Sequence, residues 1–280
     1  MTQKTLYIID LDGTLLNSHS VLSDFTITKL NTLQHDYNCL FTIATARTPA
    51  TVTQLMKKVK TTLPYIVMAG AALWDNRRQT FEDIQVISEQ VIQQLLSVYE
   101  GHQVHPFIYR CHGNCIHAYH VPAMTPDEQE FIRFRLTSPL KKLFTPDELE
   151  ATSPDSAMLI MSMGHYNELR AIANKIDDQH IACTYMCYHD IFDHEKGFLE
   201  IYAHGTTKAA AIRRMAKQTG ANRIVVFGDN LNDIPMMQMA DHSVAVGNAF
   251  NEVKAFANEV IDINDKDAVP LWIEQDLKKK

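Results

Sequence analysis

The sequence predicts an α/β fold, a doubly wound parallel sheet interrupted by an inserted α+β domain. Short apolar runs alternate with helical patterns near the N-terminus, and the same alternation returns in the last third of the chain. Between these parts, alternating segments around turns are typical of antiparallel hairpins. We therefore assign residues 1–79 and 193–280 to a core and residues 80–192 to an inserted domain.

The core begins with a buried strand at residues 6–9 (LYII), which ends abruptly in an acidic turn. A helix, a strand, a helix and a third strand follow, at residues 25–33, 39–44, 52–59 and 64–69. Pro49 suits the first turn of the second helix, because proline has no N–H to satisfy there. This order predicts parallel strands joined by right-handed crossovers.

The inserted domain is expected to hold elements of mixed type. They are a helix at 91–98, a hairpin at 106–119 around Gly113-Asn114, strands at 157–163 and 181–188, and a helix at 166–176. The core sheet is expected to return with a strand at 198–202. The remaining core elements are a helix at 207–219, strands at 223–229, 243–247 and 260–263, and a helix at 269–277.

Composition limits the class of protein. Hydrophobic residues make up 46% and charged residues 21% of 280 residues, which is typical of a globular chain with a sizeable core. The formal charge of −7 disfavours a nucleic-acid partner, and no apolar run is long enough to cross a membrane. There is no signal-peptide pattern, and five cysteines, an odd number, indicate reduced thiols. We expect a cytoplasmic protein without membrane or nucleic-acid partners; the oligomeric state stays open.

Carboxylates stand where the first strand ends. Asp10 and Asp12 flank Leu11, at the edge where open α/β sheets bind their ligands. Like charges this close repel one another unless a cation or a shared proton relieves them. An acidic turn without function would have the same sequence, so the later strand ends decide between the two interpretations.

The second strand ends in Thr45-Ala46-Arg47, just before a helix, where a hydroxyl and free backbone N–H groups can bind an anion. Lys208 stands in the first turn of a later helix, where a cation opposes the helix dipole unless an anion is near. A Val-rich strand ends in Gly228-Asp229, and Asn232 and Asp233 follow at a helix start. Taken singly, each residue could be a helix cap or an exposed side chain.

These segments resemble the four motifs of the haloacid dehalogenase-like (HAD) phosphohydrolases, in order and across both halves of the core. The motifs are DLDGT at 10–14, Thr45, Lys208, and the GDxxND pattern at 228–233. The inserted domain resembles in placement the αβ-rich cap of the Cof-type subfamily. The resemblance implies a Rossmann-like HAD core, a small-molecule phosphate ester as substrate, and Mg²⁺ as cofactor.

The resemblance also implies roles for individual residues. Asp10 would be the nucleophile that forms an aspartyl-phosphate, and Asp12 the general acid and base. The Mg²⁺ would be held by Asp10, Asp229 and the main-chain carbonyl of Asp12, with Asp233 as a second-shell or water-mediated ligand. The phosphoryl group would be bound by Thr45, the N–H groups of Leu11 and Ala46, Asn232 and Lys208.

Two positions depart from the family pattern, since relatives usually carry Gly at position 46 and Asn at position 69 where this chain has Ala46 and Ala69. Alanine at 46 can still offer its N–H, whereas the amide that is missing at Ala69 leaves open whether this position contacts substrate. Arg47 is expected to brace its loop through hydrogen bonds.

Other functions use parts of the same pattern. A phosphosugar mutase of the same superfamily would form the same aspartyl-phosphate and return the group to a sugar. A non-enzymatic phosphometabolite-binding or receiver-like module would not need Asp12, and receivers are shorter and have no inserted domain. Sugar phosphates are the first expected substrates, followed by flavin mononucleotide and pyridoxal phosphate.

The inserted domain also contains cysteines and histidines that could hold zinc. They are Cys111, His112, Cys115, His117, His120, Cys183, Cys187, His189 and His194. Their spacing matches no closed structural zinc pattern, and buried cysteine commonly acts as a small hydrophobic residue. Ordinary packing is therefore the favoured interpretation of these residues.

Overall fold

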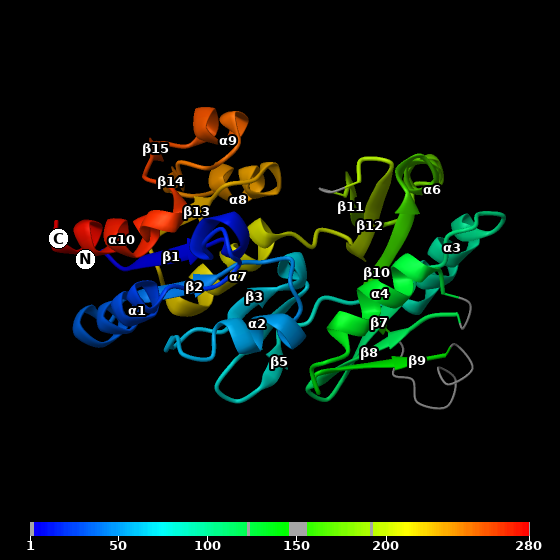
Figure 1. Ribbon diagram of the computed structural model, residues 1–280, viewed down its shortest axis with the longest axis horizontal. Helices are drawn as coiled ribbons and strands as arrows, with labels where there is room; N and C mark the ends of the chain where they lie inside the picture. Colours follow the sequence, from blue (N-terminus) through cyan, green and yellow to red (C-terminus); the bar gives the residue numbers. More distant parts are fainter. Residues whose placement is uncertain (1–2, 122–123, 146–155, 191–192, 280) are drawn as a thin grey trace. The chain divides into compact units, whose positions relative to one another are not determined.

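The structure, a computed structural model, describes residues 3–121, 124–145, 156–190 and 193–279. It divides the chain into two compact units (Figure 1). The first unit comprises Met1–Glu82 and Thr207–Lys280, and the second unit comprises Asp83–Thr206. The sequence had placed these divisions at residues 79/80 and 192/193. No helix among the described residues is long and apolar enough to span a bilayer.

The first unit is built on a parallel sheet with strand order β15-β14-β13-β1-β2. The strands are β1 (Thr5–Ile9), β2 (Leu40–Ile43), β13 (Arg223–Gly228), β14 (His242–Ala245) and β15 (Glu259–Val260). Every residue of the central β1 is buried, which explains its continuous apolar sequence. The predicted α/β core is therefore confirmed.

Helices connect these strands. They are α1 (Asp24–Tyr37), α2 (Pro49–Leu55), α7 (Lys208–Thr219), α8 (Ile234–Gln238), α9 (Asn251–Phe256) and α10 (Ala268–Lys278). From β1 the chain moves to β2 on one side, and from β13 to β14 on the other. Because crossovers of parallel strands are right-handed, α1 and α8 cover opposite faces of the sheet. This reversal of strand order beside β1 is where such sheets bind ligands.

The third predicted strand of the core exists, but its expected place in the parallel sheet is wrong. β3 (Tyr65–Val67) belongs to a separate antiparallel sheet with β4 (Ala72–Asp75) and β5 (Thr80–Glu82). Only a single parallel bridge, between Ala44 and Ile66, joins it to the end of β2. The tight turn at Met68–Gly70 sends the chain straight back along β3, so β4 takes the neighbouring position.

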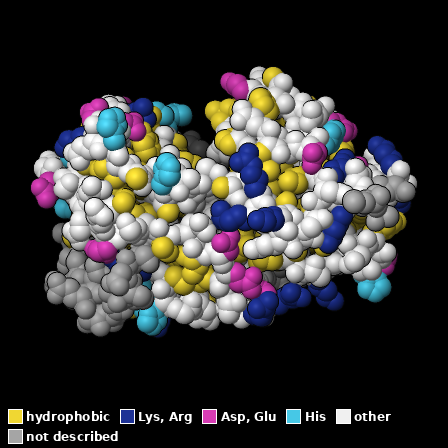
Figure 2. All heavy atoms as spheres, turned by 180° about the vertical axis from the view of Figure 1, so that it is seen from behind, with side chains coloured by type: hydrophobic (Ala, Val, Ile, Leu, Met, Phe, Trp, Pro, Cys, Tyr) yellow, Lys and Arg dark blue, Asp and Glu magenta, His cyan; other side chains and the backbone are white. Residues whose placement is uncertain are grey.

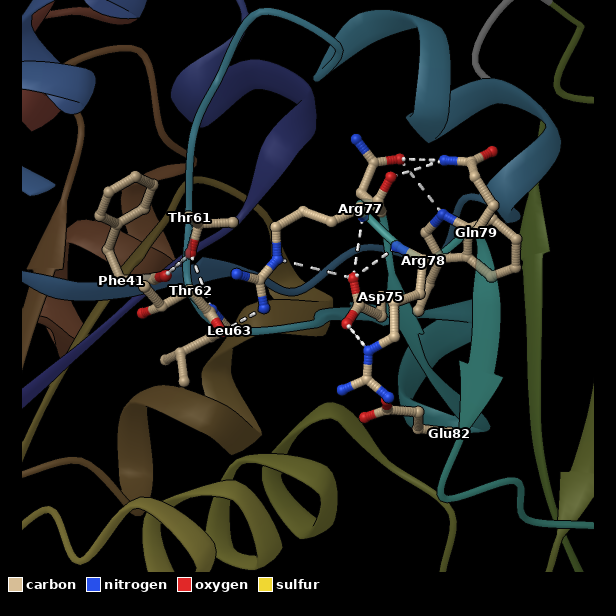
Figure 3. Close-up of polar contacts among 11 residues, drawn as sticks. Phe41, Thr61, Thr62, Leu63, Asp75, Arg77, Arg78, Gln79 and Glu82 are labelled. Carbon is tan, nitrogen blue, oxygen red and sulfur yellow. Dashed lines mark hydrogen bonds and ion pairs between the residues drawn. The ribbon is translucent and has the colours of Figure 1, made fainter.

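The turn between β4 and β5 is closed by one carboxylate (Figure 3). Asp75 accepts hydrogen bonds from the backbone N–H groups of Arg77 (2.8 Å) and Arg78 (3.0 Å), and the Nε of Arg78 lies 2.9 Å from it. Burial opposes ionisation of Asp75, but these donors and the two guanidinium charges outweigh it and lower its pKa. A guanidinium nitrogen of Arg77 also donates to the Thr62 carbonyl, which fastens the hairpin to the loop before β3.

The second unit contains a seven-stranded, mainly antiparallel sheet. Its main strand order is β11-β12-β10-β7-β8-β9, and β6 pairs with β10. The strands are β6 (Ile87–Ser88), β7 (Phe107–His112), β8 (Cys115–Tyr119), β9 (Lys141–Phe144), β10 (Ser156–His165), β11 (Cys183–His189) and β12 (Lys196–Ala203). The predicted hairpin around Gly113-Asn114 is confirmed as β7 and β8.

Among the described residues, the helices that accompany this sheet are α3 (Glu89–Tyr99), α4 (Pro126–Arg135) and α6 (Tyr166–Asp178). Apolar side chains of α3 and α6 pack with Ile108, Ile160 and Leu199 into one core on one face. Phe107, whose side chain points to the other face, instead lies 6.2 Å from the ring of Phe131 in α4. α4 and β9 were not predicted from the proline-punctuated sequence between the hairpin and β10.

A strand forms at residues 198–202 as predicted, but its predicted place in the core sheet is wrong. It is β12, and it pairs antiparallel with both β10 and β11 inside the second unit. Its burial alternates along Phe198, Leu199 and Glu200, as expected for a strand whose two faces differ. This strand is the reason why the second unit extends to residue 206.

Candidate active site

The candidate site lies where three neighbouring strands of the parallel sheet end. Asp10 follows β1, Asp229 follows β13, and Thr45 comes two residues after the end of β2. The Asp10 N–H donates to the carbonyl of Phe227 (3.0 Å), so the sheet ladder itself holds the first aspartate. Because carboxyl ends of parallel strands share one edge, residues 219 positions apart come together here.

Lys208 connects two of the acidic residues. Its Nζ donates to Asp10 Oδ1 at 2.5 Å and to Asp233 Oδ1 at 2.8 Å, and all three side chains are buried. Burial by itself lowers the pKa of this lysine, but the charges of Asp10 and Asp233 outweigh burial and raise it. The raised pKa favours the protonated form of Lys208, which is in contact with the predicted nucleophile.

Carboxylates outnumber cations in this buried place. Asp10, Asp229 and Asp233 each offer an oxygen, and these oxygens lie within 4.8 Å of one another. Burial raises the pKa of Asp10 well above its usual range, with Lys208 opposing the shift and Asp233 adding to it. Burial likewise raises the pKa of Asp229 to about 6, against the hydrogen bond from Thr14 and together with the charge of Asp233. A divalent cation would relieve this repulsion, and hard carboxylate oxygens are the donors that suit Mg²⁺.

Asp233 organises the loop around it. One carboxylate oxygen accepts from the backbone N–H groups of Asp229 and Asn230, both at 3.1 Å, and the other accepts from Lys208. A Cβ on Gly228 would lie only 2.7 Å from the Cβ of Asp233, so the glycine leaves the room this packing needs. With its oxygens occupied in this way, Asp233 fits the predicted indirect role at a metal better than direct ligation.

Asp12 lies outside the group of three carboxylates and pairs with Arg47. The guanidinium donates twice, from Nε to Oδ2 at 2.8 Å and from Nη2 to Oδ1 at 2.6 Å. The Asp12 side chain is 49% exposed, so the carboxylate is held in place but remains accessible. This bidentate pair agrees with the expectation that Arg47 braces its loop, and Asp12 is the residue that the arginine holds.

The remaining predicted phosphate-binding residues stand around this edge. Thr45 is buried, and its Oγ1 accepts the N–H of Arg47 at 3.1 Å. The N–H of Ala46 has no hydrogen-bond acceptor among the described residues. Leu11 directly follows Asp10, and Asn232 lies exposed in the turn at Leu231–Asp233.

Three residues support the site without having been assigned to it from the sequence. Thr14 is buried and donates from Oγ1 to Asp229 Oδ1 at 2.8 Å. Gly13 has a φ of +75°, and a Cβ there would lie 2.3 Å from Asp229 Oδ2. The Nδ2 of Asn248 donates to the carbonyl of Gly13 at 2.7 Å. The Gly-Thr pair after the acidic turn was the available signal for the first two. For Asn248 the signal was its place directly after the strand predicted at residues 243–247.

The cysteines and histidines of the second unit do not assemble into a comparable group. All but three of the thirteen histidines lie in this unit, and Figure 2 shows histidine side chains in separate spots on the surface. The five cysteines are free thiols. Within the ranges that the structure describes, the only His, Cys, Asp and Glu side chains placed closely enough for one metal ion are those of Asp10, Asp229 and Asp233.

Comparison with known proteins agrees with this geometry. A sequence profile described as "haloacid dehalogenase-like hydrolase" matches residues 7–273. The chain is 24% identical to the Bacillus subtilis 5-amino-6-(5-phospho-D-ribitylamino)uracil phosphatase YitU, over 98% of both chains. It is 26% identical to the Escherichia coli pyridoxal phosphate phosphatase YbhA, over 95% of this chain and 96% of the relative.

Solved structures share the fold. TM0651 from Thermotoga maritima superposes with a TM-score of 0.78 at 20% identity, covering 98% of this chain and 97% of that one. The HAD subclass IIB sugar phosphatase BT4131 superposes with a TM-score of 0.72 at 21% identity, covering 98% of both chains. Both structures resemble this chain across the first and the second unit alike.

Proposed function

Because this chain belongs to the haloacid dehalogenase-like hydrolase family and is a phosphatase, we propose that it hydrolyses small phosphorylated metabolites, sugar phosphates first among them, through an aspartyl-phosphate with Mg²⁺. The observation that carries this proposal is the close group of Asp10, Asp229 and Asp233, two of them buried against Lys208. Phosphate monoesters hydrolyse so slowly that enzymes accelerate them up to about 10²¹-fold. A site for them must neutralise the dianion before a nucleophile can approach it.

Asp10 is the proposed nucleophile. One carboxylate oxygen forms a bond to phosphorus while the bond from phosphorus to the ester oxygen breaks, which leaves an aspartyl-phosphate and an alkoxide. Lys208, 2.5 Å from Asp10, keeps the carboxylate oriented and offsets the charge of the approaching phosphate. Water then attacks phosphorus, and the Asp10 carboxylate is released with inorganic phosphate.

Asp12 is the proposed general acid and base. Its protonated form gives the proton to the leaving alkoxide, and its carboxylate then takes a proton from the attacking water. The bidentate contact with Arg47 fixes the direction of this carboxylate beside the first turn after β1. A plain binding module would have no use for an accessible acid held in this way.

Around the reacting group, Thr45, Asn232 and the N–H groups of Leu11 and Ala46 would bind the phosphoryl oxygens. Asp10, Asp229 and the Asp12 carbonyl would hold Mg²⁺, with Asp233 supporting them through its own hydrogen bonds. When bound, the ion supplies charge neutralisation at the phosphate.

The substrate is best sought among metabolites like those in the relatives' names. YitU acts on a ribitylaminouracil phosphate, YbhA on pyridoxal phosphate, and BT4131 on sugar phosphates. We expect a screen of phosphorylated metabolites, ranked by kcat/KM with Mg²⁺ and with EDTA, to give phosphate release that requires the metal. Phosphate release without an isomeric sugar phosphate separates a phosphatase from a mutase. Absence of turnover on the whole panel would contradict the proposal.

Substitution of the acid tests the mechanism. Asp12→Asn should lower kcat by about 10²- to 10⁴-fold, because the leaving alkoxide loses its proton donor. Binding of inorganic phosphate should persist, because Lys208 and Thr45 are untouched. Asp178→Asn removes an exposed acid at the end of α6 and should leave kcat unchanged. Unchanged turnover in Asp12→Asn would remove this residue from the mechanism.

A further inference from the structure

The sheet of the second unit carries polar groups on the face away from α3 and α6. Under α3 and α6, apolar side chains form one core. The opposite face also buries apolar side chains, such as Phe107 and Met161, and among them lie the hydroxyl groups of Tyr109 and Tyr202, the amino group of Lys141 and the half-buried carboxyl group of Glu200. Each of these polar groups needs a partner, because burying an unpaired polar group is unfavourable.

Glu200 has its partners. Its carboxylate accepts from the hydroxyl of Tyr188 at 3.1 Å and from the hydroxyl of Tyr202 at 2.9 Å. Burial raises the pKa of Glu200 despite these hydrogen bonds. The carboxylate of Glu200 thus accepts from two tyrosines, and the positive charge of Arg135 acts on it as well.

Lys141 has no such partner. It begins β9 beside Ile116 of β8 and is only 3% exposed. Its backbone N–H donates to Ser138, but within the described ranges its Nζ meets no hydrogen-bond acceptor and no carboxylate. What the Nζ does meet is the ring of Tyr109, with 4.2 Å to the centroid. A buried amino group over an aromatic ring, without an acid, is rare in a purely structural role.

Tyr109, whose ring lies under Lys141, also carries a polar group that lacks a described partner. It is 2% exposed, and its hydroxyl is a buried donor with no hydrogen-bond partner among the residues that the structure describes. Arg135, at the end of α4, adds a guanidinium that stacks 3.5 Å from the ring centroid of Phe131. Its charge lowers the pKa of both Lys141 and Tyr109, which places it near the two. Two donors without acceptors and a second cation thus converge on one part of the face.

We propose that Lys141 and Tyr109, with Arg135 beside them, bind an anionic oxygen group, a carboxylate or a phosphate, on the second unit. An anion supplies an acceptor for the hydroxyl of Tyr109 and for the amino group of Lys141, and it offsets the positive charge of Lys141. The site belongs to the second unit alone and does not depend on the catalytic roles assigned above. The anion is either a separate metabolite or the non-reacting acidic group of a substrate.

Direct binding tests the site. The affinity for inorganic phosphate and for malonate, measured by calorimetry at constant ionic strength, is compared between the full-length chain and Lys141→Met. The difference isolates this site, because the catalytic residues are the same in both proteins. We expect Lys141→Met to bind phosphate or malonate at this site about 10- to 100-fold more weakly, because the substitution removes one charge-assisted hydrogen bond.

Matched variants sharpen the comparison. Lys142 is the exposed neighbour on the same strand, so Lys142→Met removes an equal charge and should leave both affinities unchanged. Tyr109→Phe removes only the hydroxyl and should weaken binding by about 3- to 10-fold. Equal affinities in the wild type, Lys141→Met and Tyr109→Phe would overturn the proposal.

Two substrate classes identify the source of the anion. If the group is carried by substrate, Lys141→Met lowers kcat/KM about 10- to 100-fold for phosphate esters with a second acidic group and leaves p-nitrophenyl phosphate unchanged. If the anion is a separate metabolite, Lys141→Met weakens malonate binding, while the ratio of kcat/KM between the two classes of substrate stays the same. Loss of all phosphatase activity in the wild type would contradict the proposed function but not this site, which calorimetry still reports.

Stability and pH give an independent readout. Burial, with the charge of Arg135, lowers the pKa of Lys141 to about 7, and Tyr109 is the other group in contact with it. The folded chain then binds fewer protons than the unfolded chain between about pH 7 and pH 10, so stability rises with pH in this window. Lys141→Met should abolish that rise and be at least as stable at pH 7, and anion affinity should fall above pH 7. A destabilised Lys141→Met with unchanged anion binding would show that the lysine is structural.

Discussion

At the scale of single residues, the turn at Met68–Gly70 brings its backbone very close to Thr45 and Thr207, which flank the candidate site. Gly70 has a φ of +100°, and a Cβ there would lie 2.3 Å from the carbonyl oxygen of Thr207. Its neighbour Ala69 has a φ of +54° and donates its N–H to Thr45. The turn that carries the departure from the family pattern is therefore in contact with both the second strand end and the start of α7. Its conformation is the left-handed one, which alanine adopts at a cost.

This strain predicts the effect of restoring asparagine. Ala69→Asn should raise the free energy of unfolding by about 0.5–1 kcal/mol, because asparagine tolerates the left-handed region better than alanine. Urea denaturation measures the change. Ala69→Val is a control with the opposite expected effect, because a β-branched residue at positive φ should lower the free energy of unfolding. A loss of stability in Ala69→Asn would mean that packing around the 7% exposed side chain outweighs the backbone preference.

At the scale of elements, α7 sets the position of Lys208. Thr207 caps the helix, and its side chain accepts the N–H of Ala210 at 3.0 Å. Lys208 follows at the first helical position, where the helix dipole disfavours a cation. Asp10 and Asp233 compensate for this, so the helix start and the carboxylates depend on each other.

Weakening the cap should therefore affect both stability and turnover. Thr207→Ala should lower the free energy of unfolding by about 1 kcal/mol, because the Ala210 N–H loses its acceptor. The kcat should also fall, since Lys208 is held less firmly against Asp10. Thr207→Ser keeps the hydroxyl and serves as the control, with both quantities near wild type. If Thr207→Ala lost stability but kept its kcat, the cap would hold the helix without positioning Lys208.

At the scale of the whole molecule, folding gathers three carboxylates and one ammonium at the edge of the parallel sheet. Their mutual repulsion opposes folding unless a cation is bound, as the raised pKa values of Asp10 and Asp229 reflect. A cation that binds only the folded chain shifts the folding equilibrium by mass action. We therefore expect metal binding and stability to be coupled in this protein.

Removing the metal should lower the melting temperature. At Mg²⁺ concentrations 100 times its Kd, we expect about 2.7 kcal/mol more stability than in EDTA, measured by thermal or urea unfolding. Asp229→Asn removes one carboxylate, so it should shrink the gain from Mg²⁺ and raise stability in EDTA. Equal melting temperatures with Mg²⁺ and with EDTA would contradict a metal site built from these residues.

Much of the candidate site could be predicted because it depends on strand ends. Asp10, Thr45 and Asp229 each follow an apolar run, and parallel strands bring such residues to one edge whatever the loops do. The pair of Asp12 and Arg47 could not be derived in this way, because nothing in their spacing shows that the two side chains point toward each other. The lone donors Lys141 and Tyr109 were equally invisible, since only packing shows whether a polar group has found a partner.

The sequence by itself determined the α/β class and the interruption of the core, because periodicity and turn residues act over a few positions. The residues expected to do the chemistry came from the resemblance of its strand-end motifs to those of a known family. Only the tertiary structure decided which strands pair. β12 has the apolar pattern of a core strand yet lies between β10 and β11, and β3 turns away to pair with β4. The physical reason is that strand pairing depends on hydrogen bonds between distant segments, and the local pattern of burial is compatible with more than one partner.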